Sequence, residues 1–428
     1  MKGIFQIVFI IVFIAGAIFG ILVFSGAIKI GSDASVTGGT AVLWGTVKAG
    51  SMAKIVDEFN KSKTGYFIKY EEKSPDSFDQ NLLEALASGT GPDLFFLPDN
   101  LAFHYSNKIF PIPFSSYPLA TFKETFAGAG EVFLTNNGIL AFPVTIDPMM
   151  MYYNRSILDS NAITYPPKTW DELSAMVPVI TKKDNANKII KPAVALGYFS
   201  NVVHAKDILT AMFMQTGNGI VTSKNGMLRS ALGASGNYNL SSILQYYSSF
   251  ADSTQPVYSW NKSFSNSQDA FSREDLAFYF APASELRSLI DRNPNQNLGV
   301  APIPQLANST TKITSSRVTG VAISSASKDL TTAFVVASKI ATTDFAAKVA
   351  STLEIPPARR DLLLVKPADA YSPTFYNSAL YAKSYLDPSP KGTDDIFRTM
   401  IDTVLSNNAT ATNAVTNASS RLDILLLK

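Results

Sequence analysis

The chain has 428 residues, of which 46% are hydrophobic and 16% charged, and its formal net charge is +2. This near-neutral charge argues against a nucleic-acid partner, which calls for a strongly basic surface. There is no cysteine and there are only two histidines, which excludes disulfides, thiolate metal sites and a cysteine nucleophile and disfavours multi-histidine metal sites and serine triads. We therefore expect no cofactor. The length exceeds the roughly 250–300 residues at which a single core stops growing, so two domains are expected.

A long apolar segment lies within the first thirty residues. Ile4 to Phe24 carries no charge and has about the 20 residues needed to cross a bilayer. A cleaved signal peptide is the alternative, but this stretch is longer than the ~7–15 residues of a typical signal core. We predict that residues 1–30 form a single transmembrane anchor and residues 31–40 a flexible tether, with the rest of the chain outside the cytoplasm. Without cysteine, lipid attachment at a lipoprotein processing site is excluded.

After the tether, strands and helices are predicted to alternate. Apolar periodicity and turn residues indicate strands at Ala41–Trp44, Tyr66–Tyr70 and Leu94–Leu97, with helices at Ser51–Asn60 and Asp79–Ala87. This alternation is typical of a mostly parallel sheet covered by helices. Ligands of such sheets collect at the carboxyl ends of the strands, so Trp44, Thr46, Asp99 and Asn100 are candidate cleft residues.

Two apolar runs follow, at Ile139–Val144 and Met149–Tyr153. Asp147 and Pro148 separate them and predict a break between two short strands. Pro148 has no N–H and biases Asp147 toward an extended backbone, so the chain is expected to leave one sheet and enter another here. A carboxylate at this position would lie between two lobes.

The later part of the chain continues the alternation. We predict a helix from Trp170, capped by Thr169, and strands at Ala193–Phe199, Leu276–Phe280 and Val318–Ser324. The polar loop of residues 253–275 carries Tyr258, Trp260 and Phe264. Aromatic side chains on such a loop either anchor it to the body or line a site, and both alternatives stay open.

Several motifs keep a fixed order over residues 41–427. They are Phe59-Asn-Lys, Leu86-Ala-Ser-Gly-Thr-Gly-Pro-Asp93, Gly138-Ile-Leu-Ala-Phe-Pro143, Met151-Tyr-Tyr-Asn154, Pro166-Pro-Lys-Thr-Trp170, Leu276-Ala-Phe-Tyr279, Gly299-Val-Ala-Pro-Ile-Pro304 and Ile355-Pro-Pro-Ala-Arg359. Each motif is weak alone, but together and in this order they are specific. The chain resembles the family-1, maltose-binding-like extracellular solute-binding proteins.

The resemblance implies an α/β, two-lobed periplasmic-binding-protein fold of type II. Each lobe would be a mostly parallel sheet flanked by helices, with one transmembrane helix before them. Lobe 1 would comprise residues 41–146 plus 319–350, and lobe 2 residues 149–316 plus 354–428. A monomer of this kind would hold a carbohydrate in the cleft, close by a hinge and deliver the ligand to the permease of an ABC importer, without chemistry of its own.

The resemblance also implies ligand-binding positions. The acidic position on the crossing between lobes corresponds to Asp147, and the polar pair after the Gly-Pro-Asp strand corresponds to Asp99 and Asn100. An aromatic position after a strand of the second lobe corresponds to Tyr198, and an arginine near a later crossing corresponds to Arg359.

Two aromatic platforms that are frequent in the family are missing. Leu97 and the segment Ala281–Ser284 stand where relatives carry tryptophan, and Trp44, Trp260 or Tyr279 could replace these rings. Sugar recognition combines aromatic faces that meet C–H surfaces with carboxylates and amides that bind hydroxyls. The ligand class therefore depends on which of these rings reaches the cleft.

Two alternatives to an oligosaccharide receptor follow from the same residues. A glycoside-active enzyme could use Asp99 and Asp147, which would have to lie ~5–10 Å apart with one raised pKa. A surface interaction protein with a degenerate cleft would show no closure on a ligand. The bland interpretation of the two acids, carboxylates that bind hydroxyls, is favoured over catalysis because no further catalytic signature accompanies them.

Overall fold

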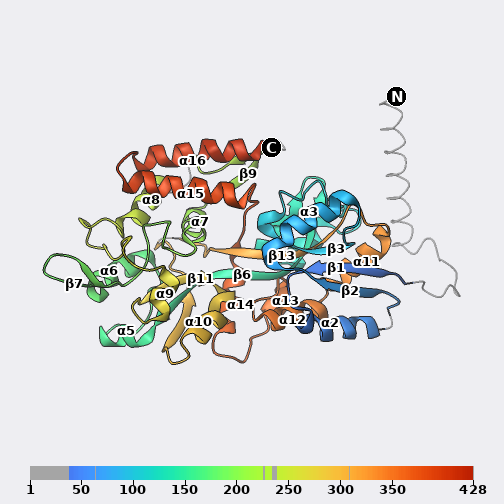
Figure 1. Ribbon diagram of the computed structural model, residues 1–428, viewed down its shortest axis with the longest axis horizontal. Helices are drawn as coiled ribbons and strands as arrows, with labels where there is room; N and C mark the ends of the chain where they lie inside the picture. The colour runs from blue at the N-terminus through green and yellow to red at the C-terminus, as the bar shows by residue number, and fades with distance from the viewer. Residues whose placement is uncertain (1–37, 63, 225–226, 234–238, 308, 428) are drawn as a thin grey trace.

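The computed structural model describes residues 38–62, 64–224, 227–233, 239–307 and 309–427 (Figure 1). The predicted anchor at residues 1–30 and most of the predicted tether lie outside these ranges. No helix within the described ranges is both long and apolar enough to cross a membrane.

The buried hydrophobic side chains of the described residues form two separate cores, which define two lobes. The core of lobe 1 contains Leu43, Phe95 and Phe142, and the core of lobe 2 contains Trp170 and Phe213. The predicted two-lobed architecture is confirmed. The segment 354–428 contributes to both cores, because residues 358 and 363 pack in lobe 1 whereas residues 397 and 422 pack in lobe 2.

Lobe 1 contains one end of the sheet and the helices that pack on both of its faces. In chain order its elements are β1 (Thr40–Gly45), α2 (Ala49–Lys61), β2 (Phe67–Glu72), η1 (Pro75–Ser77), α3 (Phe78–Ser88), β3 (Leu94–Pro98), η2 (Asp99–Leu101), α4 (Leu119–Thr125), η3 (Gly128–Phe133), β4 (Leu134–Thr135), β5 (Gly138–Ile139), α11 (Leu330–Ile340), α12 (Thr343–Leu353) and α13 (Arg360–Leu363). Each apolar stripe predicted for the first helices faces this core, as Met52 and Ile55 do on α2.

Lobe 2 carries most of the remaining helices. Its elements are α5 (Arg155–Ser160), α6 (Trp170–Ile180), β7 (Lys182–Lys183), β8 (Ile189–Lys191), α7 (Ala205–Gln215), β9 (Val221–Lys224), β10 (Met227–Ser230), α8 (Leu240–Ser249), α9 (Ser267–Ser272), β11 (Phe278–Pro282), η4 (Ala283–Glu285), α10 (Leu286–Arg292), β12 (Leu298–Pro302), α15 (Pro390–Leu405) and α16 (Ala411–Leu426). The Thr169 side chain caps α6 by accepting a hydrogen bond from the Glu172 N–H, as predicted.

Two long strands connect the lobes through the centre of the molecule (Figure 1). These are β6 (Ala141–Asn154) and β13 (Thr314–Ile323), which pair with each other antiparallel. The predicted break at Asp147-Pro148 is wrong, because β6 is continuous. Its partners change there instead: β13 pairs with β6 as far as Pro148, and β11 and β12 pair with it from Met149 and Met150 onward.

The strand directions differ between the two lobes. In lobe 1, β1 lies between β2 and β3 and is parallel to both. In lobe 2, β11 and β12 flank β6 and are both antiparallel to it, so the prediction of a mostly parallel sheet in this lobe is wrong. Helix α14 (Ser372–Leu380) and β14 (Ala382–Lys383) complete the junction, where β14 runs parallel to β13.

Candidate ligand-binding site

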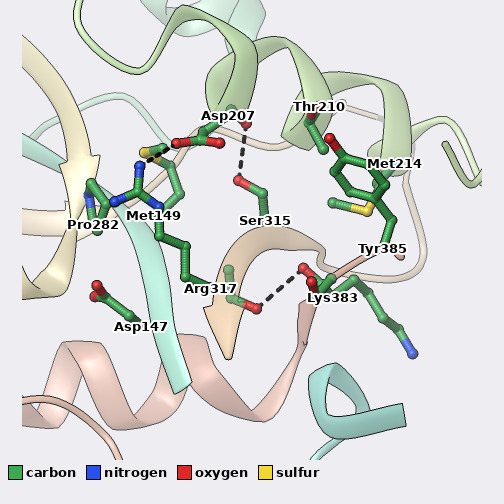
Figure 2. Close-up of a pocket in the computed structure, with 12 residues that line it drawn as sticks. Asp147, Met149, Asp207, Thr210, Met214, Pro282, Ser315, Arg317, Lys383 and Tyr385 are labelled. Atoms are coloured by element: carbon green, nitrogen blue, oxygen red, sulfur yellow. Dashed lines mark hydrogen bonds and ion pairs between the residues drawn. The ribbon is translucent and has the colours of Figure 1, made fainter. Parts of the chain in front are cut away.

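A shallow pocket, open to solvent, lies where β6 and β13 pass between the lobes (Figure 2). We call it the interlobe pocket. Its lining comes from β6, α7, β11, β13 and the chain at β14, and it comprises Asp147, Met149, Asp207, Thr210, Met214, Pro282, Ser315, Ser316, Arg317, Lys383, Ser384 and Tyr385. Segments far apart in the sequence therefore meet at the junction of the two cores.

Asp147 is the acid on β6 at this junction. Ser284 holds its carboxylate with two hydrogen bonds, from the backbone N–H to Oδ1 at 2.9 Å and from the hydroxyl to Oδ2 at 2.6 Å. Desolvation by the surrounding groups raises the pKa of Asp147 despite these bonds. The β6–β13 register places Asp147 opposite Arg317.

Asp99 approaches the same strand from the other side. It follows β3, whose Pro98 is paired with Thr319 of β13, and it is only 5% exposed. Its Oδ1 accepts a hydrogen bond from the Asn100 N–H at 2.9 Å, and its Oδ2 accepts one from the Ser384 hydroxyl. Burial raises the pKa of Asp99 to about 7. The two predicted acids thus flank β13, one from each neighbouring strand.

Arg317 begins a network of charged side chains that continues into lobe 2. Its guanidinium Nη2 donates to Asp207 Oδ2 at 2.8 Å and lies 3.2 Å from His204 Nδ1. His204 Nε2 bonds in turn to Glu285, whose Oε2 accepts from the Tyr279 hydroxyl at 2.8 Å. We call these five residues the charged network. Figure 2 shows Arg317 turned toward Asp207 and away from Asp147.

The charged network shifts the pKa values of its own members. Burial disfavours the ionised form of His204, but its hydrogen bonds to Asp207 and Glu285 outweigh burial and raise its pKa. The carboxyl groups are desolvated as well, yet the bonds and charges of His204 lower the pKa of Glu285, and His204 and Arg317 together lower that of Asp207. These groups therefore neutralise one another: Arg317 pairs with Asp207, and His204 pairs with Glu285.

The other predicted rings do not present open faces to the interlobe pocket. Trp260 is fully buried in the core of lobe 2, stacks on Phe264 at 4.8 Å and donates from Nε1 to Asn201. Tyr279 is 2% exposed. Trp44 and Tyr198 are partly exposed, and each ring carries a lysine, at 3.7 Å for Trp44 and 5.3 Å for Tyr198.

The remaining predicted residues lie outside the pocket lining. Thr46 and Asn100 are exposed. Arg359 pairs with Asp361 and donates to the Ala341 carbonyl in lobe 1. Within the described ranges, no group of histidine, aspartate and glutamate side chains is arranged to hold a metal ion.

Sequence reasoning missed Arg317, Asp207, His204 and Glu285. No local pattern marks His204, because its partners Glu285 and Arg317 are 81 and 113 positions away in the chain. A usable signal was the position of Arg317 just before the predicted Val318–Ser324 strand, between residue 316, where lobe 2 was predicted to pause, and residue 319, where lobe 1 was predicted to resume. The pairing of that strand with β6 could not be read from sequence.

Comparison with known proteins identifies the family. A sequence model of bacterial extracellular solute-binding proteins matches residues 45–344, which is more than two thirds of the chain. The chain belongs to this family. Binding proteins of Brucella abortus (strain 2308) and Brucella suis biovar 1 (strain 1330) are each 26% identical over 121 residues. That stretch spans 27% of this chain and 29% of the Brucella proteins.

Solved structures share the fold over nearly the whole described chain. The cyclic alpha-maltosyl-1,6-maltose binding protein from Arthrobacter globiformis is 17% identical with a TM-score of 0.74, covering 90% of this chain and 98% of that chain. A cyclo/maltodextrin-binding protein complexed with maltotetraose is 16% identical with a TM-score of 0.71, covering 90% and 96%. At these identities the likeness shows the fold alone. The family consists of solute-binding proteins, so its match to this chain confirms the prediction of a binding protein rather than an enzyme.

Proposed function

We propose that this protein is a membrane-tethered receptor that captures a carbohydrate between its lobes outside the cytoplasm and delivers it to an ABC importer. The observation that carries the proposal is the interlobe pocket, in which acidic and hydroxyl side chains of lobe 2, of the two crossing strands and of the chain at β14 meet. Carboxylates and hydroxyls are the groups that bind sugar hydroxyls. The structural neighbours whose printed names include maltotetraose and cyclic alpha-maltosyl-1,6-maltose add support.

Ligand capture would proceed by rotation of one lobe against the other. Only β6, β13 and the chain around α14 join the two cores among the described residues, so bending is concentrated at those segments. Asp99 belongs to lobe 1, whereas Asp207 belongs to lobe 2, and closure would bring both toward a solute that contacts Asp147. Hinge closure around a ligand is an established device of two-lobed binding proteins.

The predicted ligand contacts divide into two acids that could bind a ligand directly and two rings that are covered by lysine side chains. Asp99 and Asp147 would be the principal polar contacts, because they flank β13 beside the interlobe pocket. Trp44 and Tyr198 would join only after their covering lysines move aside. Ile4 to Phe24 would supply the membrane anchor, and a single chain would be the functional unit.

A ligand screen tests the proposal directly. The purified full chain would be heated with monosaccharides and oligosaccharides, with amino acids and peptides as non-sugar comparisons. A ligand at 100 times its Kd that binds only the folded state adds ~2.7 kcal/mol, which raises the melting temperature by several degrees. A sugar that does so should also reduce the radius of gyration in X-ray scattering. If no sugar shifts the melting temperature, the proposal fails.

A further inference from the structure

His204 lies at the start of α7, in the left-handed backbone conformation, with charged side chains at both ring nitrogens. Its Nε2 bonds to Glu285 of η4. Its Nδ1 faces two groups, the Arg317 Nη2 of β13 at 3.2 Å and the Asp207 Oδ2 of α7 at 3.5 Å. The His204 side chain is only 11% exposed, so water screens these contacts weakly. A change in the charge of this ring therefore acts mainly on these three neighbours.

The two contacts of Nδ1 exclude each other. Without a proton, Nδ1 is an acceptor and takes a hydrogen bond from the Arg317 guanidinium. With a proton, it can only donate, and Asp207 is then its acceptor. Nε2 needs its proton in both states, because the Glu285 carboxylate only accepts. Neutral His204 thus holds Arg317 in place, whereas charged His204 repels it and competes with it for Asp207 Oδ2.

Arg317 has a second carboxylate within reach. The β6–β13 register places it opposite Asp147, and opposed side chains of antiparallel strands lie on the same face with Cβ atoms about 5 Å apart. The Arg317 side chain is 55% exposed, so it can change rotamer without displacing a packed core. Asp147 accepts two hydrogen bonds from Ser284, and its carboxylate keeps lone pairs free for a guanidinium. Electrostatic attraction already acts between Arg317 and Asp147, so a weaker hold at His204 favours this second position.

Neighbouring charges set the pH at which His204 changes its charge. Burial opposes the charged ring, but the bonds and charges of Asp207 and Glu285 raise the pKa of His204 above its ordinary value of 6.5. The pKa values of both carboxyl groups are lowered, so they stay ionised through this transition. Further charged or titratable groups that act on these side chains are Asp99, Asp147, Lys206 and Tyr279. Asp99, whose pKa is about 7, titrates in a neighbouring range, so the His204 ring itself has to be observed.

We infer that His204 is a positioning residue of the interlobe pocket: its neutral ring holds Arg317 toward α7, and its protonation releases Arg317 to Asp147. We call this the His204 switch. It rests on the proposed function, in which Asp147 is a principal contact of the captured solute. A guanidinium on Asp147 occupies the carboxylate that would accept hydrogen bonds from solute hydroxyls. Solute capture should therefore weaken as the pH falls through the His204 transition.

NMR of the histidine rings tests the His204 switch without a ligand. The full chain has two histidines, and His104 is exposed and serves as the internal reference. Nitrogen spectra of the rings should show neutral His204 as the tautomer with its proton on Nε2. Arg317→Met should raise the midpoint of the His204 titration by at least about 0.5 in pH, because a repelling charge is removed. A neutral ring with its proton on Nδ1 would refute the switch.

A double substitution isolates the movement of Arg317. Asp147→Asn should lower the His204 midpoint by at least about 0.3 in pH, because the released guanidinium loses its second partner. In the Arg317→Met background, Asp147→Asn should have at most about half of that effect, since only the direct charge effect of Asp147 remains. Asp159→Asn, on the exposed surface of α5, is the matched control and should leave the midpoint unchanged. Equal effects of Asp147→Asn in both backgrounds would show that Arg317 does not move, and the switch would be wrong.

Affinity measurements connect the His204 switch to solute capture. Maltotetraose, or another sugar that passes the ligand screen, would be titrated by calorimetry about one pH unit below and above the measured His204 midpoint. The wild type should bind at least about threefold more weakly at the lower pH, whereas His204→Asn should change by less than about twofold. Equal pH dependence in both proteins would refute the control of capture, and the sugar receptor would stand. If no sugar binds, the proposed function fails, and the NMR result still decides whether Arg317 moves.

Discussion

Replacing Asp99 with asparagine should stabilise the unliganded protein at alkaline pH and have little effect at acid pH. Burial raises the pKa of Asp99 from its ordinary value of 3.8 to about 7, so the folded state holds a proton that the unfolded state releases. Stability from this group is therefore present below about pH 4 and is lost as pH rises toward 7. The shift corresponds to about 4 kcal/mol at pH 8, as an upper estimate.

Asparagine can keep both hydrogen bonds of the site. Its carbonyl oxygen can accept from the Asn100 N–H, and its amide can donate to the Ser384 hydroxyl. In urea unfolding, we expect Asp99→Asn to exceed the wild-type free energy of unfolding by about 2–4 kcal/mol at pH 8. The difference should shrink to within about 1 kcal/mol at pH 4.

Asp159→Asn is the matched control, since that side chain is exposed and should give the same small difference at every pH. A variant that is less stable than wild type at pH 8 would refute the reasoning. That result would mean that the ionised carboxylate of Asp99 is better solvated, or better paired, than its 5% exposure indicates.

Three further changes test the charged network and the core. Arg317→Ala should lower the free energy of unfolding by about 1–2 kcal/mol in urea, because Asp207 loses its partner and the guanidinium is half exposed; an unchanged value would show the pair to be neutral. His204→Asn keeps a residue that tolerates the left-handed backbone at φ 63°. It should remove a stabilisation that the wild type has below about pH 6.5 and loses as the pH rises through the raised pKa of His204. Parallel curves of stability against pH for the two proteins would contradict this. Trp260→Ala should lower the free energy of unfolding in urea by about 3–5 kcal/mol, because the ring is fully buried. Trp260→Phe should leave the affinity for the ligand unchanged in calorimetry, and weaker binding by this variant in its folded form would place the ring in the site.

The course of β6 shows what local sequence rules can and cannot predict. The two apolar runs and the position of Asp147 at a crossing between lobes were predicted from the pattern of apolar and turn residues. The break at Pro148 was not confirmed, because a proline disrupts a strand only where its missing N–H is needed. At Pro148 the strand is exchanging β13 for β11 and β12, so a gap in the hydrogen-bond ladder is tolerated.

The strand directions of lobe 2 lay beyond local prediction for a related reason. A strand was predicted at Leu276–Phe280, close to the observed β11. The antiparallel pairing of β11 and β12 with β6 depends on which edge of β6 each one meets, and residues more than a hundred positions apart decide that. Alternating strands and helices imply a parallel sheet only when each helix carries the chain back to the end of the sheet at which the previous strand began.

The candidate site divides along the same line. Asp99 and Asp147 were predicted from their positions at a strand end and at a crossing; Asp147 lines the interlobe pocket, and Asp99 is bonded to its lining residue Ser384. Arg317 and Asp207 were missed because what marks them is their ion pair, and its members are 110 positions apart in the chain. The sequence allowed Trp260 to anchor its loop or to line the site. Its full burial against Phe264 shows that it packs in the core of lobe 2.

The direction in which Arg317 points determines which charges line the interlobe pocket. If its guanidinium faced Asp147, its register partner, the two groups would form an ion pair inside the interlobe pocket. Asp207 and His204 hold it toward α7 instead, at 2.8 and 3.2 Å. The same contacts tie β13 to lobe 2, so any closure that draws Arg317 back toward Asp147 must first break them. Asp207→Asn, which removes the charge that holds the guanidinium, should therefore ease such a closure and change the affinity for a solute that contacts Asp147.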